Sequence, residues 1–428
     1  MKFKVVNACS KIKAKQRVEK YMERVNAAKI NWDNRLARVA MIQELIPLGL
    51  LAIETTLQDE VEALVGGRMS RGGDLVRWGY NPGSAYLGSQ NVSIRVPRVR
   101  NRKENVEIPL QTYEKFQDPK HVNEAVFRRV INGISMGKYE DAAEAVPEAF
   151  GQKPTTVSRR FIRAAKSKLN KLIERDLSNY DIVAIIIDGK AFGDNEIIIA
   201  VGITMSGEKI VLGIIESASE HHRVCEKLIN GLIDRKLRIE NEILFIIDGA
   251  KGLRKGIKKA LGAKAVIQRC QWHKRENVVD YLPKKLRDSY RKKMASAYRQ
   301  PTEARAKKAL ARIGRELKLM NESAYNSLME GLDETLTVNR LGLNPTLAKA
   351  LRTTNAIENI NSLIGGYTDR VDHWKTSNQR QRWVATALLE IEPKLLKLVS
   401  YRNLGDLRKA MKRFASQFPV IQTTDEAA

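Results

Sequence analysis

The stretch IVAIIIDGKAF, residues 182–192, decides the fold class of this 428-residue chain. Its apolar run leads directly into an Asp-Gly pair, Asp188 and Gly189. This is the pattern of a buried strand that ends by presenting an acid at the edge of a sheet. The stretch LFIIDGAKGL, residues 244–253, repeats the pattern with Asp248. Both stretches therefore predict strands of one sheet that carry an aspartate at their ends.

The neighbouring sequence predicts a mixed α/β sheet. The runs IIIAVGI and IVLGII follow the first strand at hairpin spacing, with turn residues at 193–195 and 206–207. A helix is expected over about 220–235, before the run ILFII. Hairpin-spaced strands followed by a helix and another strand are typical of such a sheet. After Val266 and Ile267 the sequence becomes helical and basic, which predicts a helical insertion within the domain.

A third acid, Glu358, lies in TTNAIENINS, residues 353–362, where apolar residues recur at helical spacing. The predicted buried stripe of this helix consists of Ala356, Ile360, Leu363 and Ile364. Another face is polar and carries Asn355, Glu358 and Asn361 or Ser362. Separate elements that each deliver one carboxylate to a common point would build a divalent-metal site.

Magnesium suits such a set of acids. Two strand-end aspartates on neighbouring strands repel each other, and a divalent cation removes that conflict. Mg²⁺ prefers oxygen ligands and binds one or two carboxylates together with phosphate oxygens, and Mn²⁺ can substitute for it. Two ions roughly 3.5–4 Å apart would activate an attacking oxygen and stabilise a leaving one. Asp188 would bridge both ions, with Asp248 on one and Glu358 on the other.

These residues also have local interpretations. An Asp-Gly pair at a strand end is most often a turn, and Glu358 could belong to a capping box opened by Asn355. Cys270 and His273 in QRCQWHKREN have the spacing of metal ligands. No second Cys/His pair completes a tetrahedral zinc site, which favours a structural role for this pair.

The charge of the chain favours a polyanionic partner. Lys and Arg number 75 against 49 Asp and Glu, a formal net charge of +26. Double-stranded DNA would explain this excess, although a solvated basic surface is the alternative. The charge is clustered, because residues 274–318 hold 15 basic and 5 acidic residues. This cluster begins with Lys274 and Arg275, which are expected to contact DNA.

The N-terminal part carries a second basic region. Residues from about 10 to 66 have helical periodicity, and the Gly-rich stretch 67–89 predicts an irregular basic loop. Alternating apolar residues in 92–96 then predict a short, half-exposed strand that ends in VPRVRNRK. It could be a DNA-tracking β-arm or an edge strand protected by its charges. The basic side chains in question are Arg95, Arg98, Arg100 and Arg102.

Three helices are expected next, over about 122–132, about 138–149 and from TTVSRRFIRAAKSK onward, where Thr155 or Thr156 would cap the third. This order suits a helix-turn-helix. A basic helix of an ordinary three-helix bundle fits the pattern equally well. The side chains expected to contact DNA are Ser158, Arg159, Arg160 and Arg163.

Composition restricts the setting of the protein. The three cysteines are scattered, which predicts a reducing compartment and no disulfide framework. The longest strongly apolar stretch, 46–53, is too short to cross a bilayer, and the N-terminus lacks the apolar block of a secretory signal. A soluble cytoplasmic protein associated with the nucleoid is expected, with no membrane partner.

Four motifs together resemble the Mutator-type transposases of bacterial insertion sequences: IIIDGKAF, LFIIDGAKGL, QRCQWHKRENV followed by YLP, and RTTNAIENIN. The resemblance covers about residues 85–370. It implies a multidomain α+β protein with a ribonuclease-H-like catalytic domain that a helical insertion interrupts. Asp188, Asp248 and Glu358 would be the catalytic, metal-binding triad. The family's signature near this site would consist of Cys270, His273, Asn355 and Asn361.

The resemblance also implies an activity and a domain order. The activity is metal-dependent cleavage at the ends of a DNA element and strand transfer by a 3′-hydroxyl, carried out by a homodimer or larger assembly on DNA. A nuclease of the same fold and a catalytically silent DNA-binding protein are the alternatives. The expected domains are a helical and basic-strand region (1–120), a helix-turn-helix-like domain (121–175), the first part of the catalytic core (176–275), the insertion (276–350), the last core helix (351–370) and a helical C-terminus (371–428).

Overall fold

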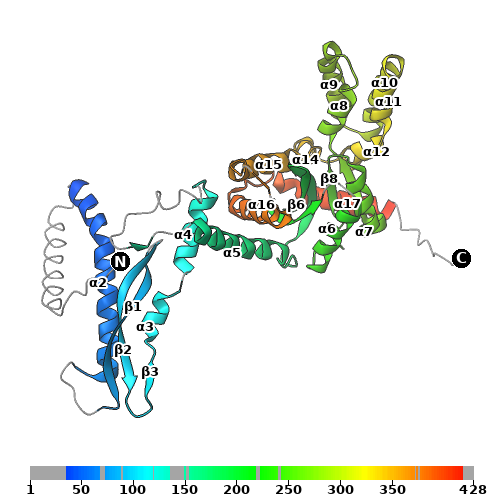
Figure 1. Ribbon diagram of the computed structural model, residues 1–428. Coiled ribbons are helices and arrows are strands. Elements are labelled where there is room, and N and C mark those ends of the chain that lie inside the picture. The colour runs from blue at the N-terminus through cyan, green and yellow to red at the C-terminus, as the bar shows by residue number, and fades with distance from the viewer. Residues whose placement is uncertain are drawn as a thin grey trace. The chain divides into compact units, whose positions relative to one another are not determined.

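A computed structural model describes residues 35–67, 73–87, 90–118, 120–134, 149–150, 154–217, 222–239, 242–371, 373–374 and 376–417. The chain divides into two compact units, Met1–Ala164 and Ala165–Ala428, and each is described by itself. Helices and strands are mixed in both, which confirms the α+β class (Figure 1). The finer domain boundaries expected from the sequence stay predictions. Most of the second helix expected at 138–149 lies outside the described residues.

A helix and a small antiparallel sheet form the core of the first unit. Helix α2 (Arg35–Val65) ends before Gly66, whose φ is +78°. Strands β1 (Leu75–Leu87), β2 (Gln90–Asn101) and β3 (Val106–Ile108) lie in that order, and β4 (Ala149–Phe150) also pairs with β2. The short helix α3 (Gln111–Phe116) follows β3. The buried residues that join α2 to this sheet are Ile53, Leu57, Val61, Ala85, Ile94, Val96 and Val99.

Two expectations for this region are wrong. The stretch 67–89 is largely strand, because β1 pairs with β2 along almost its whole length. The strand was not predicted because Gly79 and Gly83 are typical of loops. Gly83 is needed there because a Cβ would lie 2.5 Å from the side chain of Val96. The edge-strand alternative for 90–101 also fails, since β2 has neighbours on both sides.

Helices α4 (Lys120–Ile131) and α5 (Pro154–Ile173) match the first and third helices expected from the sequence. Gly133, with φ of +102°, follows α4. Phe127 and Phe161 stack with ring centroids 5.8 Å apart and join the two helices. α5 begins at Pro154, so neither Thr155 nor Thr156 is its cap.

A five-stranded sheet forms the centre of the second unit, in the order β7-β6-β5-β8-β9. Strands β5 (Ile182–Phe192), β6 (Asn195–Thr204) and β7 (Lys209–Ser217) are antiparallel, whereas β8 (Leu244–Ile247) and β9 (Val266–Arg269) run parallel to β5. The first four were expected from the sequence, but β9 was not, because its apolar run is only two residues long.

Helices cover both faces of this sheet because its strands are apolar on both sides. On β5, Ile182, Ile185 and Ile187 pack beneath α6 (His222–Asp234) and α7 (Lys251–Leu261). Val183 and Ile186 face the opposite core. The elements of that core include α14 (Pro345–Leu351), α15 (Asn355–Thr368), α16 (Ser377–Ile391) and α17 (Leu404–Gln417).

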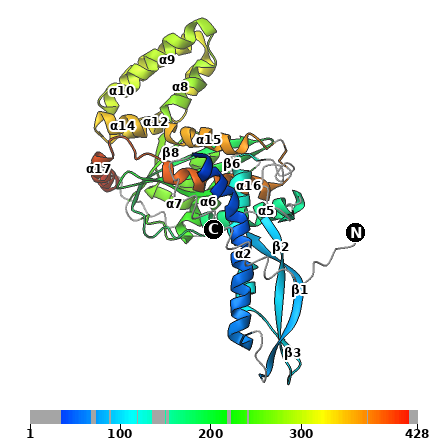
Figure 2. The same ribbon diagram turned by 90° about the vertical axis from the view of Figure 1, so that its left-hand side faces the viewer.

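A helical block with its own core separates β9 from α15. It comprises α8 (Gln271–Val279), α9 (Lys284–Tyr298), α10 (Glu303–Met320), α11 (Glu322–Met329), α12 (Leu332–Thr335) and α13 (Thr337–Arg340). In Figure 2, α9 and α10 project away from the sheet. Buried Gln268 ties the block to β9, because its amide donates to the Thr335 carbonyl and accepts from the Val338 amide.

Short 3-10 turns complete the second unit: η1 (Gly262–Lys264), η2 (Glu392–Lys394) and η3 (Tyr401–Asn403). The C-terminal helices are fixed to the sheet by ion pairs. Arg380 of α16 meets Glu216 of β7 at 2.6 Å, with both side chains almost buried. No helix among the described residues is long and apolar enough to cross a membrane.

Candidate active site

The register of the sheet places Asp188 and Asp248 side by side. Only β8 ends at its aspartate as expected, because β5 pairs with β6 beyond Asp188 as far as Phe192. Ile187 of β5 pairs with Ile247 of the parallel strand β8, and each aspartate is the next residue. Asp188 is 9% exposed. Asp248 accepts a hydrogen bond at Oδ1 from the Ala250 amide at 2.8 Å. Oδ1 of Asp248 thus takes part in a local turn, as the turn interpretation predicted. Oδ2 remains available for another ligand.

Helix α15 brings the third acid from the other side. Its N-cap is Thr354, and Glu358 accepts a hydrogen bond from the Thr354 hydroxyl at 2.8 Å. The capping box opened by Asn355 is thus absent, and Asn355 is exposed as the first helical residue. Asn361, one turn after Glu358, donates from Nδ2 to Asp188 Oδ2 at 3.2 Å.

The buried stripe of α15 differs in part from the predicted one. Ile357, Ile360 and Ile364 are buried, whereas Leu363 is 45% exposed. This rotation of the helix turns Glu358 and Asn361 toward β5, because residues three apart lie on one helix face.

The negative charges of Asp248 and Glu358 act on the carboxyl group of Asp188. Burial, followed by the negative charges of Asp248 and Glu358, raises the pKa of Asp188 to about 7, and His273 acts in the opposite direction. Asp188 therefore keeps its proton below about pH 7 unless a cation takes the place of that proton.

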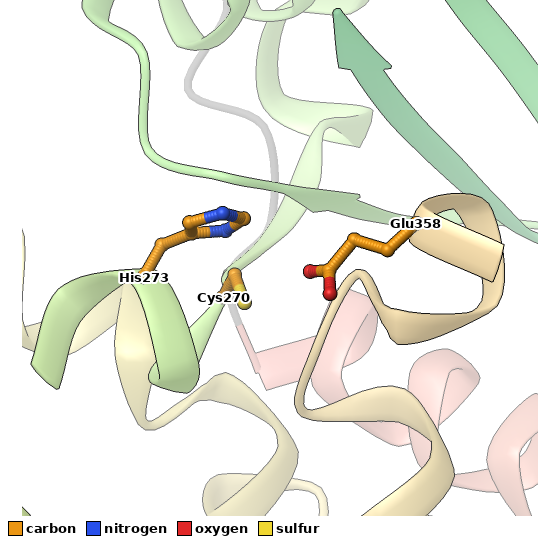
Figure 3. Close-up of side chains that lie close together, drawn as sticks. All are labelled: Cys270, His273 and Glu358. Atoms are coloured by element: carbon orange, nitrogen blue, oxygen red, sulfur yellow. The ribbon is translucent and has the colours of Figure 1, made fainter. Parts of the chain in front are cut away.

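Glu358 also belongs to a cluster with Cys270 and His273 (Figure 3). One ligand atom from each of Cys270, His273 and Glu358 lies within 4.8 Å of the other two. Thr354 links them, since its hydroxyl also lies 3.5 Å from Cys270 Sγ and 3.4 Å from His273 Nδ1. Hydrogen bonding to Cys270, reinforced by Asp188 and Asp248, raises the pKa of His273 to about 9. The pair from QRCQWHKREN thus belongs to the same site as the three acids.

Glu196 is a fourth acid at the site that sequence reasoning missed. It lies at the start of β6, and its carboxyl group covers Gly189, where a Cβ would overlap it. Burial and the charge of Asp248 raise the pKa of Glu196. The predicted hairpin could have indicated Glu196, because its pairing with Ala191 places Glu196 near Asp188 and Gly189.

The donor set fits a hard divalent cation. Asp248 and Glu358 are near enough to act on the charge of Asp188, and their repulsion is of the kind that Mg²⁺ or Mn²⁺ relieves. The oxygens of the three acids do not all lie within 4.8 Å of one another, whereas the ligand atoms of Cys270, His273 and Glu358 do. Asn361 Oδ1 is buried without a hydrogen-bond partner, so an acceptor oxygen is left for a cation or its water. Asp188, Asp248 and Glu358 are the residues that could hold such an ion.

Of the side chains in the first unit that were predicted to contact DNA, some already have partners within the protein and others are exposed. Arg98 is paired with Glu107 at 2.6 Å, and Arg160 donates to Asn123 Oδ1 at 2.7 Å and to the Tyr86 hydroxyl. The guanidinium of Arg100 lies 5.1 Å from the Trp78 ring centroid. The exposed members of the predicted set are Arg95, Arg102, Arg159 and Arg163, and Ser158 is half-buried.

The expected DNA contact at Lys274 does not fit its burial. Lys274 is 2% exposed, and its ammonium donates to the carbonyls of Ser327 and Glu330, each at 2.7 Å. Burial and the charge of Arg269 lower the pKa of Lys274 to about 8. Lys274 holds α8 against α11, whereas its neighbour Arg275 is only half-buried.

Comparison of the sequence with known proteins matches the chain to a family. The family model "Transposase, Mutator family" matches residues 38–395, which include all three acids. The chain belongs to the Mutator family of transposases. The transposase for insertion sequence element IS905 of Lactococcus lactis is 26% identical over 82% of this chain and 90% of its own length. The transposase for IS256 in transposon Tn4001 of Staphylococcus aureus is 22% identical over 74% of this chain and 80% of its own. The transposase for ISRM5 of Rhizobium meliloti is 24% identical over 75% and 80%, respectively.

Proposed function

We propose that this Mutator-family transposase cleaves DNA at the ends of its own element and joins the freed 3′-hydroxyl to another phosphodiester, using divalent metal held by Asp188, Asp248 and Glu358. The observation that carries the proposal is the register that places Asp188 beside Asp248, together with the hydrogen bond from Asn361, one turn from Glu358 on α15, to Asp188. The three acids are separated by long stretches of sequence. Separate elements have no local reason to bring like charges together, whereas a shared cation gives them one.

The sheet supports the proposal of a ribonuclease-H-like catalytic domain. Three consecutive antiparallel strands are followed by two parallel ones, with β5 in the centre. This order places Asp188, within β5, beside the end of β8, where Asp248 follows the strand. The helical block between β9 and α15 is the proposed insertion, and the packing of α14 and α15 onto the sheet brings the last acid back to it.

The roles of the residues follow from their surroundings. A divalent ion bound at such a site supplies an activated oxygen nucleophile and stabilises charge on the leaving oxygen. Asp188 is the central ligand, because Asp248 and Glu358 both act on its carboxyl group. Asn361 orients Asp188, and Thr354 orients Glu358, through the hydrogen bonds already described. Mg²⁺ is the proposed ion, with Mn²⁺ as a substitute.

Double-stranded DNA is the proposed substrate, both as element ends and as target. The net charge of +26 and the exposed arginines Arg95, Arg102, Arg159 and Arg163 support it. Because two ends must meet, a homodimer or larger assembly on DNA is proposed.

The decisive experiment uses DNA that carries the terminal repeats of the element encoding this chain. Asp188→Asn, Asp248→Asn and Glu358→Gln should each abolish strand transfer while end binding in chelator stays within about twofold of the wild type. Asp194→Asn, in the exposed β5–β6 turn, is the matched control and should keep full activity. Strand transfer that persists in chelator, or in any of the three variants, would overturn the proposal.

A nuclease of the same fold is the competing assignment. It would cut the element ends and fail to join them. Pre-cleaved ends with a free 3′-hydroxyl separate the two functions, because a transposase should insert them into target DNA without further cleavage.

A further inference from the structure

A basic hollow of about 480 Å³ lies between α8 and α9, outside the group of acids. It is lined by Trp272, Arg275, Glu276, Arg291, Lys292 and Arg299, together with Ala295. None of these residues has a place in the metal-dependent chemistry proposed above.

The hollow contains cationic charge that the protein does not neutralise. Arg291 pairs with Glu276 at 2.8 Å and with Asp288 at 2.7 Å, so the acid in the lining is already compensated. Among the described residues, Arg275, Lys292 and Arg299 have no ion pair. Arg275 Nε is also shielded from solvent without a hydrogen-bond partner. Three uncompensated cations around one hollow suit an anionic ligand.

Trp272 connects the hollow to the candidate active site. Its side chain is 40% exposed, and its ring meets His273 edge to face with the centroids 4.8 Å apart. His273 in turn lies in the cluster with Cys270 and Glu358. His273 therefore lies between Trp272, which lines the hollow, and the triad acid Glu358, and part of the Trp272 side chain is exposed.

We propose that this hollow binds an unpaired nucleotide of the DNA substrate, with its base stacked on Trp272 and its flanking phosphates held by Arg275, Lys292 and Arg299. The inference rests on the proposed function, since the phosphodiester at the acids would belong to the same strand. Stacked bases of an intact duplex offer no free face to Trp272, so the ligand is a base that is flipped out or lies in a single strand. Exposed tryptophan with arginine is the combination that binds such bases without reading their sequence.

The test measures binding in chelator, where no cleavage occurs. The full chain is titrated with a labelled oligothymidylate of about eight nucleotides and with an abasic oligomer that has the same number of phosphates. Trp272→Ala should weaken oligothymidylate binding about tenfold and leave abasic binding unchanged, because only the first ligand can stack. Trp272→Phe should retain most of the affinity, which separates stacking from a folding defect.

Two matched variants control for position and charge. Tyr281→Ala removes another exposed aromatic residue of the helical block and should change neither affinity. Arg275→Ala with Arg299→Ala should weaken the binding of both oligomers and reduce the log–log salt slope by about 0.7 for each phosphate that the protein no longer binds. Lys308→Ala, an exposed cation on α10, should leave the slope unchanged.

The outcomes separate this inference from the proposed function. Equal losses for thymidylate and abasic oligomers in Trp272→Ala, or no loss for either, would overturn the nucleotide hollow even if the wild type transposes DNA. A base-dependent effect of Trp272 in a protein that fails to cleave element ends would leave the hollow standing and reject the catalytic proposal.

Discussion

Replacing Asp188 by asparagine should increase the free energy of unfolding of the metal-free protein above neutral pH, although it removes the central metal ligand. Burial and two neighbouring carboxylates raise the pKa of Asp188 from 3.8 to about 7. Between these values the folded state holds a proton that the unfolded state has released. The contribution of Asp188 to the free energy of unfolding is therefore fully present below about pH 4 and is lost as the pH rises through about 7.

The size of the effect follows from the same pKa. One pKa unit corresponds to about 1.4 kcal/mol, so ionising Asp188 costs the metal-free folded state up to about 4 kcal/mol at alkaline pH. Asparagine has no proton to lose, so the variant should keep at alkaline pH the free energy of unfolding that the wild type has at acidic pH. The Asn361 amide can turn so that its oxygen accepts from the new side-chain amide. The free energy of unfolding of Asp188→Asn should exceed that of the wild type by on the order of 2–4 kcal/mol at about pH 8.5. Near pH 4 the difference should be less than about 1 kcal/mol.

Amide hydrogen exchange of peptides from β5 and β8, followed in urea with chelator, measures this difference in the second unit alone. Adding Mg²⁺ should stabilise the wild type at about pH 8.5 and have little effect on Asp188→Asn. Asp194→Asn is again the control. A stability difference that is the same at both pH values would refute the assignment of the raised pKa to this buried group of carboxylates.

Three further substitutions test other parts of the site. Lys274→Met should destabilise the second unit by about 1–3 kcal/mol in urea unfolding, since two carbonyls lose their donor, and should leave the salt slope of DNA binding unchanged. Gly249→Ala should cost about 1–2 kcal/mol, because φ is +116° there and the Arg269 guanidinium lies 2.6 Å from the position of a Cβ; a neutral result in the same assay would contradict this. Glu196→Gln should keep strand transfer at saturating Mg²⁺ but need several-fold more metal for half-maximal rate, because one negative charge near Asp248 is lost; an unchanged metal requirement would show that Glu196 does not contribute to the site.

Sequence reasoning succeeded where the physical signal is local. Apolar runs before Asp-Gly predicted the strands β5 and β8, although β5 continues past Asp188 to Phe192, and helical periodicity predicted α15. It failed for β1, because glycines and Pro82 resemble a loop when the pairing partner is unknown. It also failed for Lys274, whose charge is typical of a surface residue although its ammonium lies among buried carbonyls.

The sequence by itself determined which chemical groups exist: three acids on separate elements, a Cys-His pair and a large excess of positive charge. Only the tertiary structure decided that Glu358 and Asn361 face Asp188, that Glu196 joins them and that Trp272 opens onto a hollow of unpaired cations. The physical reason is that strand and helix patterns depend on neighbours a few residues away. The pKa of Asp188 and the free charge beside Trp272 depend instead on which distant segments exclude water from the same space.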